Sequence, residues 1–158
     1  MTHDTRDSPT LPALQRGLAN LVPHHDAARW MQLLVADGLD VLPPPGCGQT
    51  LHRWQSLAAV AAHDLSLAKL YEGHTDALGI LNELSHPLPP APQSVWGVWA
   101  AEAPAARVVI QPDTAAGAGT VHLTGLKGWC SGASAGRGTS WRSGRREIGT
   151  ALTGWPAR

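Results

Sequence analysis

A proline-rich segment near the middle of the chain constrains the fold more than any other feature. Residues 85–94 read Ser-His-Pro-Leu-Pro-Pro-Ala-Pro-Gln-Ser, and prolines at this density interrupt helices and central strands because each one fixes φ and removes a backbone donor. Apolar residues recur at helical spacing before this segment, and short strand-like runs follow it. The sequence therefore predicts an α+β fold, with a helical domain over residues 10–84, a linker over 85–94 and a partial antiparallel β-domain over 95–133.

The helical half carries the signals of four helix starts. A helix commonly begins after a side chain whose oxygen accepts a hydrogen bond from the first turn. Four such residues precede the four apolar stripes: Thr10, Asp26, Thr50 and Asp64. We expect Pro23 to end the first helix, Gly38 to lie just past the second, and the fourth to run to about Leu84 as the centre of a bundle.

Beyond the linker, the apolar pattern predicts strands at Trp96–Glu102, Arg107–Gln111 and Val121–Leu123. Residues 134–158 are locally basic and show no period, which predicts a disordered, irregular tail, and the polar residues 1–9 are expected to be flexible. A second hypothesis for the tail is a shift of the coding frame soon after Ala133. The DNA of the gene tests it, since one of the other frames past codon 133 must then continue the β-domain.

The segment from Thr124 to Ala133 is the predicted site. Trp129 and Ser131 would point to the same side of a strand, because alternate strand positions share a face. The glycines around them leave the backbone bare, so a flat ligand can approach the main chain. An indole with a hydroxyl and backbone N–H groups beside it suits a planar heteroaromatic ring such as a flavin or a nucleobase. The alternative is a buried strand whose tryptophan belongs to the core.

The pattern Gly125-x-Lys127-x-Trp129-Cys130-Ser131-Gly132-Ala133 resembles the glycine, lysine, tryptophan, then Ser/Thr segment of the acyl-CoA dehydrogenase family. In that family the segment is a strand of the middle β-domain that contacts FAD. The resemblance implies that Trp129 packs against the flavin ring and that Ser131 supplies the hydroxyl near its N5 edge. It covers roughly residues 11–133, and the family has the same order of a helical domain followed by a β-domain.

The first β-strand of that family carries a Thr-Glu pair, whose threonine touches the flavin, and then a Gly-Ser-Asp element near the acyl-CoA. The matching stretch here begins at Trp99, keeps the glutamate as Glu102, and has Ala101 in place of the threonine; no Gly-Ser-Asp follows. The resemblance implies main-chain contacts of FAD with Trp99, Ala100 and Ala101, without the side-chain bond.

The resemblance implies a flavin-dependent oxidoreductase that dehydrogenates an acyl-CoA thioester between its α and β carbons. FAD would accept the hydride, an electron-acceptor flavoprotein is a possible partner, and full-length family members are homo-oligomers. In most members the catalytic base lies in a C-terminal helical domain with no counterpart here, so we name no catalytic residue and expect an incomplete chain that is inactive alone. Two alternatives stay open: a flavin-dependent monooxygenase of the same fold, and a non-catalytic truncated fragment.

Charge and apolar runs exclude several partners. The formal net charge is zero and the pI is about 7.1, which gives no electrostatic basis for binding nucleic acid or an anionic membrane. The apolar runs are too short to span a membrane, and the polar start is unlike a signal peptide. Cys47 and Cys130 are far apart and in no metal or redox spacing, so we expect a cytoplasmic protein with reduced cysteines.

The histidines do not predict a metal site. His52, His63 and His74 recur every eleven residues, and eleven helical residues rise about 16 Å, so neighbours in this series cannot share one ion. We expect no bound metal. His74 lies on the apolar stripe of the fourth helix and is predicted to be a hydrogen-bonded histidine of the core or of an interface.

Overall fold

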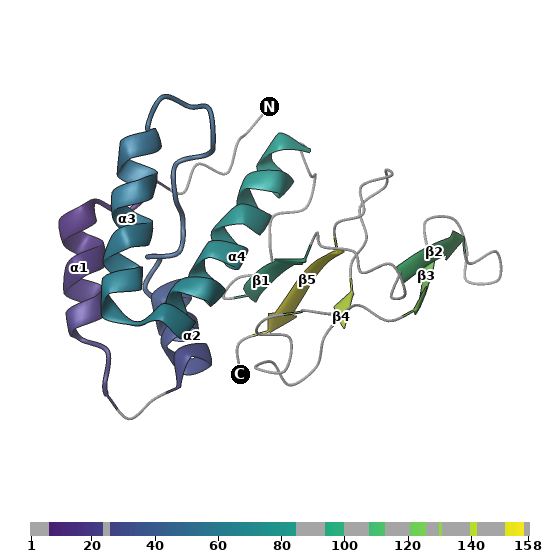
Figure 1. Ribbon diagram of the computed structural model, residues 1–158, viewed down its shortest axis with the longest axis horizontal. Coiled ribbons are helices and arrows are strands. Elements are labelled where there is room, and N and C mark those ends of the chain that lie inside the picture. The colour runs from purple at the N-terminus through teal and green to yellow at the C-terminus, as the bar shows by residue number, and fades with distance from the viewer. Residues whose placement is uncertain are drawn as a thin grey trace.

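Helices come first and strands afterwards in the computed structural model, which describes residues 7–23, 26–84, 94–99, 108–112, 121–125, 130, 140–141 and 151–156. The elements are α1 (Leu11–Ala19), α2 (Ala27–Ala36), α3 (Thr50–His63), α4 (Leu65–Glu83), β1 (Ser94–Trp99), β2 (Val108–Pro112), β3 (Val121–Gly125), β4 (Ser140–Trp141) and β5 (Ala151–Pro156). Figure 1 shows the four helices gathered on one side, with α4 next to β1, and the β2–β3 pair at the far end. The mixed class of a four-helix part followed by strands is thus confirmed.

Side-chain caps begin three of the four helices. Thr10, Asp26 and Asp64 each accept a hydrogen bond from the backbone N–H three residues later, at 3.4, 2.8 and 2.7 Å. These predicted caps are confirmed. The prediction for Thr50 is wrong, because it is the first residue of α3 and follows Gln49, whose side chain makes no cap bond. Gly48, with φ of 84°, turns the chain directly before Gln49, so α3 starts one residue earlier than expected.

The ends of the helices agree with the sequence signals except in α1. Gly38 follows α2 with φ of 69°, a left-handed conformation that suits glycine. Leu84 is the C-cap of α4, as predicted. The first helix ends at Ala19, well before Pro23, because the N–H of Asn20 bonds the carbonyls of both Arg16 and Gly17 and closes the last turn.

All four helices and β1 share one apolar core. Its buried members are Leu14, Leu18, Leu21, Met31, Leu34, Val35, Leu42, Val60, Leu67, Tyr71 and Val95. A smaller cluster joins Ala77 and Leu81 of α4 to Trp96 of β1. Burying one large apolar side chain stabilises a fold by about 1.5–3 kcal/mol, so β1 is held to the helices by Val95 and Trp96.

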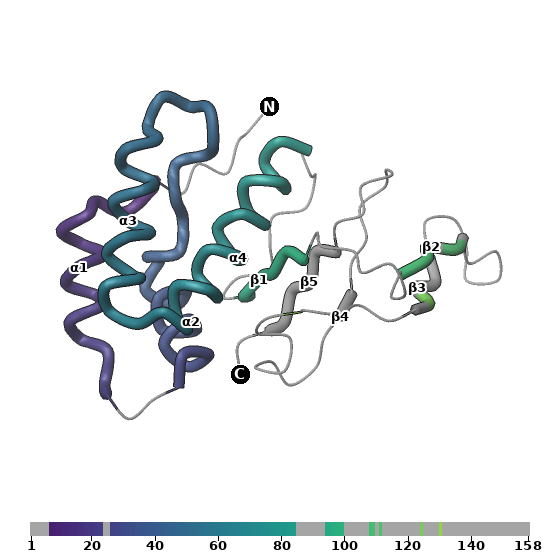
Figure 2. Tube along the Cα trace, in the orientation of Figure 1, coloured from purple at the N-terminus to yellow at the C-terminus, as the bar shows by residue number. Residues whose placement is uncertain are grey.

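The segment between α2 and α3 lies along the bundle between α3 and α4, as the trace in Figure 2 shows. Two side chains of these helices hold its backbone. Tyr71 Oη donates to the carbonyl of Leu39 at 2.8 Å, and Arg53 Nη1 donates to the carbonyl of Pro43 at 3.2 Å. The segment therefore has fixed neighbours although it contains neither helix nor strand.

The described strands form two antiparallel groups. One has the order β1-β5-β4, in which Ser94 faces Pro156 and Trp99 faces Ala151; the other pairs β2 with β3. The strands predicted near 107–111 and 121–123 are present as β2 and β3, while residues 100–102 of the first predicted strand lie outside the described residues. These groups do not establish the β-domain that the resemblance implies, which stays a prediction.

The structure differs from the sequence predictions at both ends of the β region. Ser94 was assigned to the linker and is the first residue of β1. Residues 140–141 and 151–156 fall in the predicted irregular tail and are strands. Pairing with the edge of β1 satisfies the backbone of β5, and this non-local gain outweighs the weak local signal of the segment.

Within the described ranges, no helix combines the length and apolar content needed to cross a bilayer.

Candidate functional site

The predicted cofactor contacts are Trp99, Ala100, Ala101, Trp129 and Ser131. Only Trp99 belongs to the described part of the chain; the other four lie outside it. Trp99 is the last residue of β1 and is 7% exposed. The surroundings of this residue are therefore where the structure bears on the expected flavin site.

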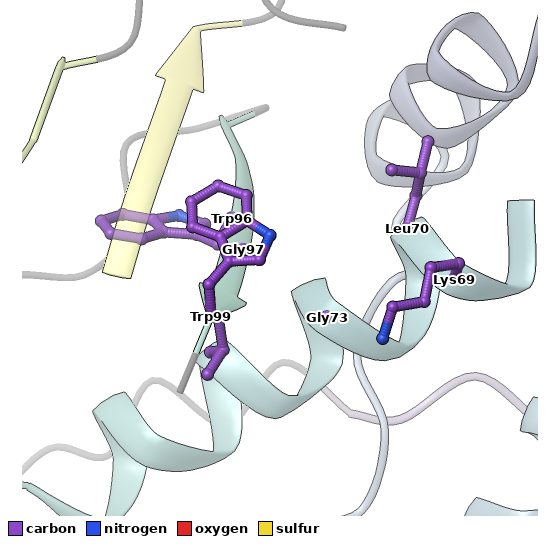
Figure 3. A pocket seen from close by; sticks show the side chains of 7 residues that line it. Lys69, Leu70, Gly73, Trp96, Gly97 and Trp99 are labelled. Atoms are coloured by element: carbon purple, nitrogen blue, oxygen red, sulfur yellow. The ribbon is translucent and has the colours of Figure 1, made fainter. Parts of the chain in front are cut away.

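A small hollow lies between α4 and the end of β1 (Figure 3). Its walls include Lys69 and Gly73 of α4 and Trp96, Gly97 and Trp99 of β1. The hollow has room for about a single water molecule. The tricyclic ring of a flavin does not fit this hollow, so we derive no chemical step through a flavin at this place.

The indole of Trp99 lies over the bare backbone of Gly97. A Cβ atom at Gly97 would lie 3.0 Å from Cζ2 and 3.1 Å from Cη2 of that ring. One side of the Trp99 ring is thus occupied by its own strand. The contact between helix and strand is looser, since a Cβ at Gly73 would lie 4.0 Å from the backbone nitrogen of Val98.

A buried histidine connects three separate parts of the chain. His74 of α4 is 0% exposed, and its Nε2 lies 2.9 Å from Oδ2 of Asp40, in the segment between α2 and α3. Its Nδ1 lies 2.9 Å from the backbone nitrogen of Trp96 in β1. We call this group of Asp40, His74 and the Trp96 amide the His74 junction. It confirms the prediction of a hydrogen-bonded histidine in the core.

The partners of His74 determine which ring nitrogen carries the proton. A backbone N–H can only donate, so Nδ1 of His74 must accept from Trp96 through its lone pair. The other nitrogen, Nε2, then carries the hydrogen and donates it to the carboxylate of Asp40. His74 is therefore neutral in this arrangement, in the Nε2–H tautomer.

Further ionisable side chains surround the junction. Burial raises the pKa of Tyr71, and the negative charge of Asp40 raises it further, while the positive charge of Arg53 lowers it. Arg53 is itself 7% exposed, and its Nη2 lies 2.6 Å from Oδ1 of Asp76. Asp76 thus pairs with the buried guanidinium of Arg53, and burial keeps Tyr71 as a neutral donor.

The geometry of His74 suits a structural role and not proton transfer to a substrate. Both ring nitrogens already have protein partners, and the side chain is 1% exposed. A general base needs a lone pair within reach of the substrate proton. The sequence pointed to His74 through its apolar stripe but missed Asp40, although an aspartate inside the apolar run Leu39-Asp40-Val41-Leu42 is a signal of a buried, bonded carboxylate.

Two other histidines, His52 and His63, make separate contacts. His52 Nε2 lies 3.1 Å from the carbonyl oxygen of Pro9, and the ring of His63 meets that of Trp30 edge-on at 5.5 Å between centroids. In the portion of the chain that the structure describes, no three His, Cys, Asp or Glu side chains gather as a metal site would require.

Comparisons of the chain with models of protein families, with curated proteins and with solved structures found no match. The resemblance to acyl-CoA dehydrogenases therefore depends on the quoted sequence motifs and on the order of helices and strands.

Proposed function

We propose that this chain is a flavin-dependent oxidoreductase of the acyl-CoA dehydrogenase type, which dehydrogenates an acyl-CoA thioester between its α and β carbons. The observation that supports the proposal is the way the helical part meets the first strand. Four helices precede β1, α4 packs against it, and the strand ends at Trp99, where the stretch with the expected main-chain contacts to FAD begins. The motif at Trp129 and Ser131 adds the expected ring and hydroxyl.

We assign the following roles toward FAD to the residues of the chain. Trp129 is the side chain that would pack against the flavin and Ser131 the hydroxyl that would bond it, and bound FAD would supply the hydride acceptor. The hollow beside Trp99 is too small for the ring, so we assign Trp99 a main-chain contact and no stacking role. We assign no base, and the buried carboxylate of Asp40 is not available as one because it accepts the Nε2 hydrogen of His74.

An FAD titration followed by tryptophan fluorescence tests the proposal, and it separates cofactor binding from turnover. We expect saturable quenching in the wild type that is largely lost in Trp129→Ala. Trp54→Ala is the matched control, because Trp54 is 65% exposed on α3 and its loss should leave the quenching unchanged. Equal quenching in the wild type and Trp129→Ala, or no quenching in either, would contradict the proposal.

A flavin-dependent monooxygenase on the same fold is the second candidate. The absence of a Gly-Ser-Asp element after Glu102 favours this candidate, because in the family that element lies near the acyl-CoA. The two activities differ in what they consume. Bleaching of bound flavin by an acyl-CoA indicates a dehydrogenase, whereas oxidation of a substrate that requires both reduced flavin and O2 indicates a monooxygenase.

A further inference from the structure

We infer that the His74 junction is a pH-dependent connection between the helical bundle and β1. In its neutral form His74 holds the strand through the Trp96 amide, and a proton added to Nδ1 releases that amide. The inference depends on the three bonded groups alone and is independent of flavin binding.

Protonation of Nδ1 removes the only bond that His74 makes to β1. The protonated ring has a hydrogen on each nitrogen, so Nδ1–H would face the N–H of Trp96 at the 2.9 Å separation of the present bond. Two donors cannot bond each other. The Trp96 amide cannot turn away, because the residues on both sides of it are held in β1. The amide of Trp96, a residue that is 8% exposed, would lose its buried acceptor.

The negative charge of Asp40 stabilises the protonated form of His74, in opposition to the loss of the bond at Nδ1. Its carboxylate attracts a protonated imidazole, but it already accepts the Nε2 hydrogen in the neutral form, so protonation adds no new hydrogen bond there. The other ionisable groups around the junction are Tyr71, which burial keeps neutral, and the Arg53–Asp76 ion pair. The loss at Nδ1 therefore has no compensating bond within the junction.

The strand keeps its apolar anchors when the bond is lost. Val95 remains in the helical core, and Trp96 remains beside Ala77 and Leu81. We therefore expect local opening of β1 on acidification while the helices stay folded, and not global unfolding.

Nuclear magnetic resonance of protein labelled with ¹⁵N in histidine and tryptophan tests the inference directly. At neutral pH, His74 should show an unprotonated Nδ1 and a protonated Nε2. As the pH is lowered, the protection factor of the Trp96 amide against hydrogen exchange should fall roughly tenfold or more, in step with the protonation of Nδ1 that the ¹⁵N shifts report. An Nδ1–H tautomer at neutral pH, a ring that stays unprotonated until the protein unfolds, or a Trp96 amide that keeps its protection after Nδ1 is protonated, would overturn the inference.

Two substitutions separate the two ring nitrogens. In His74→Asn the amide oxygen takes the place of Nδ1 and cannot titrate, so the Trp96 amide should stay protected down to acid pH. In His74→Gln the side-chain amide reaches toward Asp40, so the Trp96 amide should be unprotected at every pH. Identical Trp96 protection in the two variants would contradict the assigned roles.

His63→Asn is the control, since His63 is exposed and contacts Trp30, and it should leave the pH profile of Trp96 unchanged. If His74→Asn and His74→Gln fail to fold, the titration of the wild type still decides, because it follows the His74 ring and the Trp96 amide in the unaltered protein.

Discussion

The guanidinium of Arg53 and the carboxylate of Asp76 form an ion pair of unequal burial. Nη2 of Arg53 lies 2.6 Å from Oδ1 of Asp76, yet the arginine side chain is 9% exposed and that of the aspartate 46% exposed. Nη1 of the same arginine donates to the carbonyl of Pro43. One buried cation thus joins α3, α4 and the segment between α2 and α3, and it relies on a carboxylate that water can reach.

Replacement of Asp76 by alanine should lower the free energy of unfolding by about 1–2 kcal/mol, because Arg53 is left buried with one partner fewer. The loss should be smaller than the roughly 3–5 kcal/mol typical of a fully buried pair, since water partly replaces the carboxylate. Urea denaturation measures it. Glu72→Ala is the control, because its ion pair with Lys69 is exposed and should contribute less than about 0.5 kcal/mol. Equal losses in both variants would be inconsistent with the buried role of Arg53.

Two glycines at the contact of α4 and β1 should respond to alanine in opposite ways. Gly97→Ala should destabilise the protein by about 1 kcal/mol or more, because the new methyl group meets the Trp99 ring at 3.0 Å. Gly73→Ala should be neutral or stabilising by up to about 1 kcal/mol, because alanine favours the helix and the nearest atom is 4.0 Å away. Thermal unfolding compares the two. A destabilised Gly73→Ala together with a neutral Gly97→Ala would show that this packing is wrong.

Replacement by alanine should affect stability differently at two buried serines. Ser56 is 0% exposed and its hydroxyl makes no hydrogen bond to any residue of the described part, so Ser56→Ala should leave stability unchanged or raise it slightly. Ser94 accepts a hydrogen bond from Trp96 Nε1 at 2.8 Å, and Ser94→Ala should cost about 1–2 kcal/mol because it leaves a buried donor without that acceptor. Chemical denaturation of the pair provides the measurement, and a larger loss for Ser56→Ala would refute the assignment.

Tyr71 is the only tyrosine of the chain, so its ionisation can be followed without interference from others. Burial raises its pKa in the folded protein above the ordinary value near 10. The unfolded chain then loses this proton first as the pH rises, so the stability contributed by the neutral phenol is complete below about pH 10 and declines above it. Ultraviolet absorbance of phenolate should appear only together with unfolding.

Tyr71→Phe supplies the control for that titration. It removes the bond to the Leu39 carbonyl, which should cost about 1 kcal/mol, and it should abolish the phenolate signal while leaving part of the alkaline unfolding. A phenolate signal that appears near pH 10 in protein that is still folded would contradict the buried position of the ring.

The sequence predicted those structural features that depend on residues close together in the chain, such as helix caps. Asp26 and Asp64 act as caps because the groups they satisfy lie within the next turn of the same helix. His74 was predictable as a core histidine from its place on an apolar stripe. Its pairing with Asp40 was not, because the two residues lie thirty-four positions apart and only the path of the chain between α3 and α4 brings them together.

The β region shows the same limit more strongly. The run in β1 is recognisable alone, but its partner β5 lies in a stretch that has no strand period, and the register of Ser94 with Pro156 follows from tertiary pairing. The site residues Trp129 and Ser131 were predicted from a sequence motif, and Trp99 was predicted because its stretch matches the first β-strand of the family. The packing of Trp99 on Gly97 could not be predicted, because it depends on the side-chain rotamer of Trp99 as well as on the sequence.

The pairing of β1 with β5 imposes an order of events during synthesis. Helices α1 to α4 lie within residues 11–83 and can associate as soon as they leave the ribosome, whereas β1 waits for residues 151–156 before this edge is covered. During that interval the strand already docks on α4 but presents unpaired N–H and C=O groups to other nascent chains. Misassembly of this protein at high expression should therefore begin at residues 94–99.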